Sequence, residues 1–309
     1  MVRIERFRST WGVEPGENLE AWRPLFVEWK KLAYGLIVLR HQMARVVDAI
    51  RVDGVEMVPY DLDEDQRQQV RTLCDDLGLK ISITIFSAWH RYRGPRPRGL
   101  TPDVHLEGYR EELRRAQVLK PVKINAQSGA DFWSWEQAAY FFKNTLRIDQ
   151  ELGFQGRVCH ETHRNRGLFN PYVTDYVLQK VPELRITGDF SHWIVGCERL
   201  LDVGEEDQEL LDRVIPHVYH IHTRIGTTQS SQCPEPLNPI FKAEREFFEK
   251  LWVRIVKSRA QRDHNSVITF VPEYGLFPYH PFGSVRTAAA VADSEGPRLQ
   301  KLFEESLDQ

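Results

Sequence analysis

Hydrophobic residues recur along the chain with two alternating periods. Eight short segments are apolar or alternate apolar with polar residues, as β-strands do. Each is followed by a longer segment with apolar residues at helical spacing. The expected strands are Val2–Thr10, Ala49–Met57, Leu79–Phe86, Pro121–Ala126, Gly156–Glu161, Leu184–Asp189, Val218–Thr223 and Ser266–Glu273. The expected helices are Glu17–Tyr34, Asp61–Leu77, Pro102–Leu119, Ser134–Leu152, Asn170–Val181, Asp207–Ile215, Pro239–Arg259 and Ala288–Leu307.

This alternation of strands and helices is typical of a parallel sheet. Eight units, with no linker or low-complexity tract between them, predict an α/β protein with one (β/α)8 TIM-barrel domain that spans residues 1–309. The alternative is an open, doubly wound sheet. It is disfavoured because no G-x-G-x-x-G motif follows the first expected strand.

Composition is that of an ordinary globular protein. The 309 residues are 41% hydrophobic and 28% charged, and the net charge is −3, so we expect no nucleic-acid partner. None of the four cysteines belongs to a C-x-x-C pair, and we expect free thiols. The N-terminus has no apolar signal core, and no apolar run approaches the ~20 residues of a membrane span. We therefore expect a soluble cytoplasmic protein without a membrane partner, and a homo-oligomer is compatible with these features.

Ionisable residues stand at the ends of the last four expected strands. They are Glu161, Asp189, His222 and Glu273. The first two intervals between them each match one βα unit of roughly 30 residues, and the third is longer by a Pro-rich insertion at Ser230–Pro239. Because the carboxyl ends of parallel strands meet at one face of a barrel, we expect these four side chains to share one divalent metal ion.

Three carboxylates and one imidazole form an oxygen-rich ligand set. Such a set favours Mn²⁺, and Mg²⁺, Co²⁺ or Zn²⁺ would also fit. A six-coordinate ion with four protein ligands keeps two positions for substrate oxygens, as in an α-hydroxycarbonyl or a vicinal diol. His220 points the same way as His222, and a register error of one residue would turn both away from the barrel axis. His222 is nearer the strand end, so it is the better ligand.

These segments resemble the xylose isomerase-like superfamily of TIM barrels, which contains sugar phosphate isomerases and epimerases and the endonuclease IV-type enzymes (AP endonuclease family 2). The resemblance rests on Lys123–Ala138, Glu161 in CHETH, Asp189 and His192 in GDFSHW, His222 in YHIHTR and Glu273 in PEYG. It implies a metal-dependent isomerase or epimerase of a sugar or polyol ketone. Such an enzyme abstracts a proton next to a metal-bound carbonyl and passes through an ene-diolate. Glu161 and Glu273 would then be the catalytic bases.

Other residues near the strand ends are candidates for contact with a small carbohydrate-like substrate. Arg224 follows His222 by two residues and shares its direction if the strand persists, so it could stabilise an oxyanion or bind a carboxylate. The sugar epimerases of the superfamily place a substrate arginine several residues further on, where this chain reads IGTTQ. The expected substrate-binding residues are His192, Arg224, His163, Gln127, Trp89 and Trp193.

Three other functions stay open. A lyase or dehydratase acting on a keto-sugar or keto-glycoside would use the same metal-stabilised enolate. An endonuclease IV-like phosphodiesterase would need additional early histidines, and His90 is the only obvious candidate; the net charge is also wrong for binding DNA phosphates. A barrel that binds a partner without catalysis would have no use for the four-ligand set.

Overall fold

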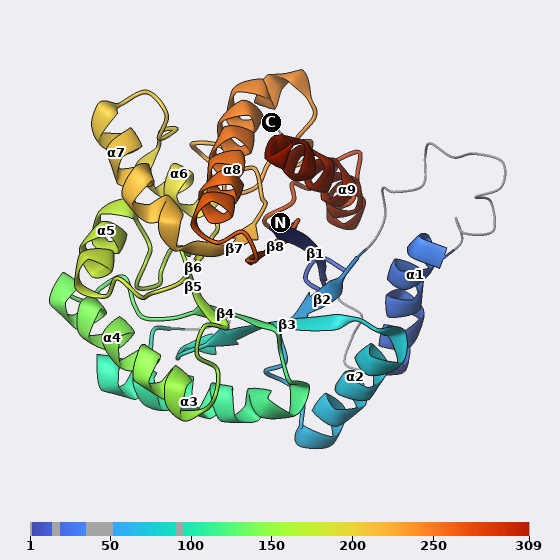
Figure 1. Ribbon diagram of the computed structural model, residues 1–309, viewed down its shortest axis with the longest axis horizontal. Coiled ribbons are helices and arrows are strands. Elements are labelled where there is room, and N and C mark those ends of the chain that lie inside the picture. The colour runs from blue at the N-terminus through green and yellow to red at the C-terminus, as the bar shows by residue number, and fades with distance from the viewer. Residues whose placement is uncertain (1, 14–18, 35–51, 91–94, 309) are drawn as a thin grey trace.

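Eight parallel strands close into a barrel in the computed structural model, which describes residues 2–13, 19–34, 52–90 and 95–308 (Figure 1). The strands pair in sequence order, and β1 pairs with β8. This closure confirms the (β/α)8 barrel and excludes the open sheet. The strands are β1 (Arg3–Ser9), β2 (Gly54–Met57), β3 (Lys80–Phe86), β4 (Lys123–Gln127), β5 (Val158–Glu161), β6 (Ile186–Gly188), β7 (Val218–His222) and β8 (Val267–Val271).

Helices surround the barrel (Figure 1). The α-helices are α1 (Trp22–Tyr34), α2 (Glu64–Leu77), α3 (Pro102–Ala116), α4 (Trp135–Glu151), α5 (Pro171–Lys180), α6 (Ser191–Cys197), α7 (Glu205–Val214), α8 (Lys242–Arg262) and α9 (Ala288–Leu307). Short 3-10 turns adjoin four of them: η1 (Leu19–Ala21), η3 (Gln117–Leu119), η4 (Ile215–His217) and η5 (Pro239–Phe241). Among the described residues, none of these helices combines the length and the apolar character needed to cross a bilayer.

Local sequence signals explain where the helices begin and end. Asp63 caps α2 by accepting from the backbone N–H of Gln66, whose side chain accepts from Asp63 in return. Ser134 forms the same reciprocal cap on α4. Gly78 ends α2 with φ of 59°, a left-handed conformation that glycine adopts without steric cost.

Apolar residues fill the layer between the barrel and the helices. One cluster includes Phe141, Trp193 and Trp252 beneath α4 to α9, and a second includes Phe26 and Tyr109 beneath α1 to α3. The barrel interior near the strand ends is polar by contrast. A carboxylate on β2 contacts a histidine on β7, two strands that are not neighbours in the sheet, so this contact spans the interior. The helices are thus held by apolar packing, and the polar side chains are turned inward.

Two features differ from the expectation. The helix α6 begins directly after β6 and was not expected, because SHWIVGC is short and lacks a capping side chain on Phe190. The strand β2 begins at Gly54 rather than at Ala49; residues 49–51 of the expected strand lie outside the described residues, and Val52 and Asp53 precede the strand. Neither difference moves the ends of the strands, and those ends carry the site.

Candidate metal centre

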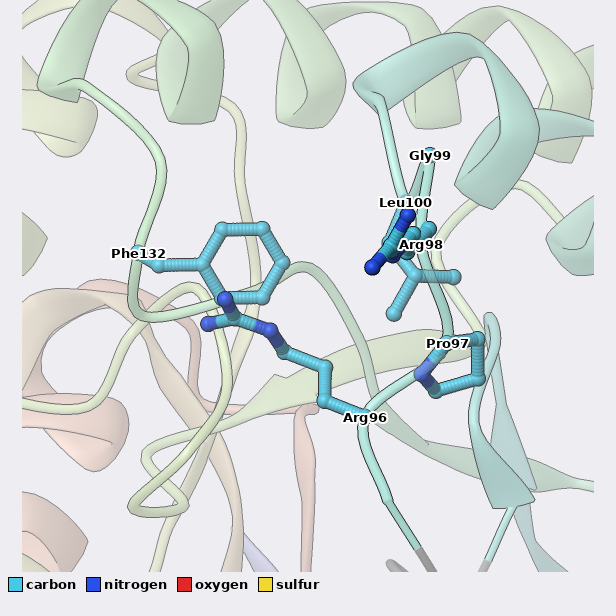
Figure 2. Close-up of a pocket in the computed structure, with 6 residues that line it drawn as sticks. All are labelled: Arg96, Pro97, Arg98, Gly99, Leu100 and Phe132. Carbon is cyan, nitrogen blue, oxygen red and sulfur yellow. The ribbon is translucent and has the colours of Figure 1, made fainter.

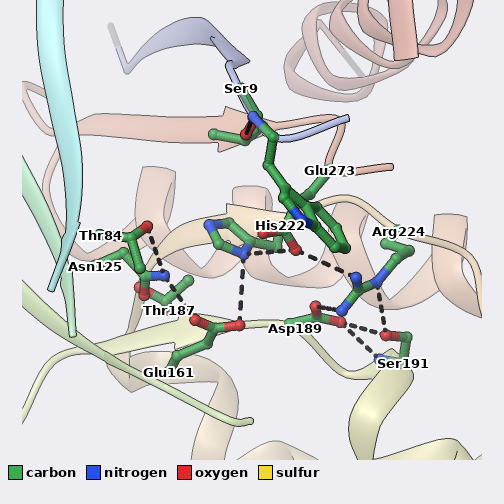
Figure 3. A network of polar contacts seen from close by, with 12 residues as sticks. Ser9, Thr84, Asn125, Glu161, Thr187, Asp189, Ser191, His222, Arg224 and Glu273 are labelled. Atoms are coloured by element: carbon green, nitrogen blue, oxygen red, sulfur yellow. Dashed lines mark hydrogen bonds and ion pairs between the residues drawn. The ribbon is translucent and has the colours of Figure 1, made fainter. Parts of the chain in front are cut away.

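Four expected ligands lie together at the carboxyl end of the barrel. Glu161 is the last residue of β5, Asp189 directly follows β6, His222 is the last residue of β7, and Glu273 lies two residues after β8. One ligand atom from each of these residues lies within 4.8 Å of the others. Figure 3 shows how the four side chains turn toward one another. The sequence-based ligand set is therefore brought into one cluster by consecutive strands.

The centre of this cluster is the Nδ1 atom of His222. It lies 3.6 Å from Glu161 Oε1 and 3.2 Å from Glu273 Oε2 (Figure 3). Neither His222 Nδ1 nor Glu161 Oε1 has a hydrogen-bond partner, although both atoms are buried. Unpartnered buried polar atoms are rare in native proteins and call for a ligand or another explanation. A cation between these atoms would satisfy both of them.

Burial and charge perturb the titration of these groups. Burial alone would raise the pKa of Glu161, but His222 and the other hydrogen-bonding neighbours lower it to about 2. Burial alone would lower the pKa of His222, but Glu273, Glu56 and Glu161 together raise it well above its usual value. Burial raises the pKa of Asp189 to about 6 in spite of the nearby Arg224. Neighbouring carboxylates contribute to the raised pKa values of His222 and Asp189, and such crowded carboxylates attract positive charge.

Asn125 on β4 fixes one oxygen of the Glu161 carboxylate. Its Nδ2 donates to Glu161 Oε2 over 2.6 Å, which leaves Oε1 directed at His222 (Figure 3). Asn125 was not expected as a site residue. The sequence nevertheless indicates an inward polar residue here. The inward positions of KINAQ carry Lys123, Asn125 and Gln127, three polar side chains in an otherwise apolar strand.

Glu56 on β2 lies behind His222 and was also missed. Its Oε1 is 3.0 Å from His222 Nε2, and its Oε2 is 3.0 Å from His220 Nε2 and accepts from the hydroxyl of Ser82 over 2.7 Å. With its proton on Nε2, facing Glu56, a neutral His222 would present its lone pair at Nδ1. The signal was a glutamate inside the strand GVEM, where a buried charge needs a partner.

Arg224 is fully enclosed beside the ligands. It forms an ion pair with Asp189, and its Nη1 lies 3.5 Å from Glu273 Oε2. Its Nε donates to Ser191 Oγ over 3.2 Å, and that hydroxyl donates to Asp189 Oδ1 over 2.5 Å (Figure 3). The expected direction of Arg224 toward the site thus holds, although β7 ends two residues earlier.

Two groups of three side chains also have the spacing of a metal site: Glu56 with His220 and His222, and Glu161 with His163 and His192. Glu161, His163 and His192 offer ligand atoms within 4.8 Å of one another. Burial and electrostatic repulsion by His163, Arg224 and Arg164 lower the pKa of His192 well below its usual value. Two guanidinium groups beside a single carboxylate repel a second cation. The group around His222, with its three carboxylates, is therefore the better metal site.

Three further residues were expected to contact the substrate, namely Gln127, Trp89 and Trp193, and they lie in different environments. Gln127 ends β4 on the same face as Asn125, near the site. Trp89 follows β3 and is partly buried, and its carbonyl accepts from Arg166. Trp193 is fully buried in the hydrophobic core, where its indole N–H donates to the Leu168 carbonyl over 3.0 Å. Trp193 therefore lies in the core, and the expectation that it contacts the substrate is corrected.

A separate surface hollow is lined by the loop 96–100 and Phe132 (Figure 2). The guanidinium of Arg96 lies 4.4 Å from the centre of the Phe132 ring. Among the described residues that line this hollow there is no expected ligand or substrate residue, and no carboxylate or imidazole. It offers no acid–base or metal chemistry, so the candidate site is the cluster around His222.

The donor set at His222 fits a divalent cation. Three carboxylates and an imidazole nitrogen are ligands that Mn²⁺, Mg²⁺ and related hard ions accept. Asn125 contacts Glu161 and Glu56 contacts His222. Supporting contacts of this kind commonly orient the ligands in metalloproteins. The described residues thus hold buried groups that could bind a metal ion.

Solved structures with a similar fold support this description of the barrel. A D-psicose 3-epimerase from Clostridium cellulolyticum H10, in a complex with D-tagatose, aligns with 98% of this chain and 99% of its own, with a TM-score of 0.57 and 13% identity. A xylose isomerase domain-containing protein from Salmonella typhimurium LT2 aligns with 98% of this chain and 97% of its own, with a TM-score of 0.55 and 15% identity. The chain has the fold of the xylose isomerase-like barrels.

Other chemistry also occurs on this fold. A probable 3-DHS dehydratase, AsbF, from Bacillus anthracis aligns with 97% of this chain and 99% of its own, with a TM-score of 0.51 and 16% identity. No family model matches the sequence, and no curated protein matches it. At these identities the likeness describes the xylose isomerase-like fold, and the reaction has to be argued from the site.

Proposed function

We propose that this protein is a divalent-metal-dependent isomerase or epimerase of a sugar or a related polyol ketone, with Mn²⁺ as the metal. The observation that carries the proposal is the cluster of Glu161, Asp189, His222 and Glu273, whose ligand atoms lie within 4.8 Å of one another. The likeness to a D-psicose 3-epimerase adds support at the level of the fold.

The ion would supply Lewis-acid polarisation of a substrate carbonyl, which acidifies the neighbouring C–H. Glu161 and Glu273 approach the site from β5 and from the segment after β8. They are the two bases that could take and return the proton. Asn125 holds one oxygen of Glu161, and the side chain of Glu273 keeps 12% of its surface exposed. Glu273 is thus the more accessible of the two to a substrate entering from solvent.

Arg224 would hold Asp189 in place and stabilise negative charge that develops on the substrate. Its guanidinium is fully buried and pairs with Asp189, so the carboxylate has little freedom to rotate. A buried arginine beside a developing oxyanion stabilises it without reorganisation. Gln127 and Trp89, at the ends of β4 and β3, complete the proposed substrate surface.

Elimination is the second candidate, because one solved structure with this fold is described as a probable dehydratase. The same carboxylates would remove the proton, and a β-leaving group would depart in place of proton return. The two reactions differ in one observable. An isomerase or epimerase exchanges a substrate C–H with solvent deuterium without losing a group, whereas a lyase releases water or an alcohol.

Metal content is the first test of the proposal. Purified protein dialysed against Mn²⁺ should retain about one ion per chain by elemental analysis, and Glu161→Gln should lose it. Glu112→Gln is the matched control, because Glu112 is a buried carboxylate on the outer helix α3. A panel of ketoses in deuterated buffer then tests the reaction. Absence of metal from the wild type, or full exchange activity in Glu273→Gln, would overturn the proposal.

A further inference from the structure

Two arginines approach the same histidine beside the proposed metal centre. Arg164 Nη1 lies 3.1 Å from His192 Nδ1, and Arg224 Nη2 lies 2.9 Å from His192 Nε2. An imidazole, neutral or protonated, has at most one acceptor nitrogen. His192 can therefore accept a hydrogen bond from one of the two guanidinium groups at a time, and it offers neither of them a negative charge.

The same two cations also flank one aromatic ring. The guanidinium carbons of Arg164 and Arg224 each lie 5.3 Å from the centre of the Tyr279 ring. The indole of Trp11 packs against Tyr279 at 5.0 Å and lies 5.5 Å from Arg224. Aromatic faces attract cations, and they hold the planar guanidinium groups in fixed orientations.

The two arginines differ in their carboxylate partners. Arg224 is paired with Asp189 and lies near Glu273. Arg164 forms no ion pair with any carboxylate among the described residues, and it is only partly buried. Among the described residues, its charge thus has no carboxylate partner at the edge of a site into which the proposed substrate must enter.

Backbone geometry fixes the position of Arg164. The segment after β5 turns sharply, with the backbone N–H of Arg166 donating to the His163 carbonyl over 3.2 Å. Asn165 has φ of 65°, a left-handed conformation that asparagine tolerates better than most residues. His163 Nδ1 donates to the Arg164 carbonyl over 2.6 Å. The turn presents Arg164 toward His192 and not along the barrel surface.

We propose that Arg164, with Arg224 and His192, binds an oxyanion of the substrate, so that the substrate class is an acidic sugar or polyol ketone that carries a carboxylate or a phosphate. This inference rests on the proposed function, because the metal centre would hold the reacting oxygens while Arg164 holds the charged end. Guanidinium groups bind carboxylates and phosphates through paired N–H donors, and Arg164 offers this chemistry because no carboxylate among the described residues pairs with it.

Matched ligands test this inference on the Mn²⁺-loaded protein by calorimetry. The probes are vicinal diols that carry a terminal carboxylate on one to three methylene groups, the phosphate monoesters of equal length, and the corresponding neutral triols. We expect at least one acidic probe to bind about tenfold to a hundredfold more tightly than its neutral partner, as one or two charge-assisted hydrogen bonds would provide. The comparison of carboxylate with phosphate identifies the source of the charge.

Variants assign the effect to Arg164. Arg164→Met should remove the preference for the acidic probe and leave the neutral probe unaffected, and Arg164→Lys should keep part of it. Arg157→Met is the control, because Arg157 is exposed and directly precedes β5, at the opposite end of the barrel. Thermal unfolding and Mn²⁺ content verify that each variant is folded and loaded.

The outcomes separate the two proposals. A protein that holds no Mn²⁺ refutes the proposed function. A protein that holds Mn²⁺ but binds acidic and neutral probes equally, or that keeps the preference in a folded Arg164→Met variant, refutes the oxyanion site alone.

Discussion

Glu56 should control metal affinity without touching the metal. Its carboxylate lies 3.0 Å from the Nε2 atoms of both His220 and His222 and accepts a hydrogen bond from Ser82. Glu56→Gln keeps the shape of the side chain. The amide oxygen can still face His222, and the amide N–H₂ can face His220, whose other nitrogen lies 2.6 Å from the hydroxyl of Thr269. Packing and hydrogen bonds can therefore be kept while the charge is lost.

The magnitude follows from this substitution. A hydrogen bond to a charged group contributes about 1.5–3 kcal/mol and one between neutral groups about 0.5–1.5 kcal/mol. The difference of about 1–1.5 kcal/mol at His222 corresponds to roughly tenfold weaker metal binding. Glu56→Ala removes the partner altogether and should approach the hundredfold loss seen when such supporting contacts are deleted.

Proton competition modifies this effect in a predictable direction. Glu56 is one of the carboxylates that raise the pKa of His222, and the protonated imidazole cannot bind a metal. Loss of Glu56 lowers that pKa and so weakens the competing proton. We expect the deficit of Glu56→Gln to be largest at high pH, where His222 is neutral in both proteins, and smaller toward pH 6.

Calorimetric Mn²⁺ titration between pH 6 and 9 measures both effects. Glu112→Gln again serves as the control for loss of a buried carboxylate on the outer helix α3. If Glu56→Gln binds Mn²⁺ within a factor of two of the wild type at pH 9, then Glu56 does not orient His222 and the reasoning fails.

Three further predictions follow from the same contacts. Metal binding near neutral pH should release about one proton per ion, because the raised pKa keeps His222 protonated until the ion displaces the proton. Calorimetric titration in buffers of different ionisation enthalpy measures the number of protons released. Binding without proton release would contradict the raised pKa of His222. Asn125→Leu leaves one buried oxygen of Glu161 without its donor and should lower turnover about tenfold and the free energy of unfolding by about 1–3 kcal/mol, and unchanged turnover would show that this contact is dispensable for catalysis. Gly275→Ala places a methyl carbon 2.0 Å from the nearest carbon of the Trp11 indole and should lower the free energy of unfolding by about 1–3 kcal/mol in urea titrations. Wild-type stability would show that the indole can move.

Much of the barrel could be predicted from the sequence because strand ends and helix caps are local signals. The alternation of apolar strands with amphipathic helices gave the number of units, and Gly78 marked the end of a helix. The short helix α6 could not be found, since seven residues without a capping side chain carry too weak a periodicity. Its first turn nevertheless places His192 beside Asp189, at 3.6 Å.

The ligand candidates could be proposed because the position of a residue along its strand determines its height along the barrel axis. Glu161 and His222 end their strands, and consecutive parallel strands bring those ends to one face. The same rule says nothing about which side chains meet across the interior. Glu56 reaches His220 and His222 from the opposite wall, so its role depends on closure of the sheet and on the distance across it.

The distribution of charge around the proposed metal centre explains why its carboxylates need positively charged neighbours. The carboxylates of Glu161, Asp189 and Glu273, two buried and one partly exposed, would repel one another without positive charge between them. Arg224 supplies one such charge beside Asp189, and the raised pKa of His222 supplies another in the absence of metal. An ion that displaces the His222 proton therefore exchanges one positive charge for two. That gain in attraction to three carboxylates is a physical reason for the site to favour a divalent cation over a proton once the pH is high enough to release it.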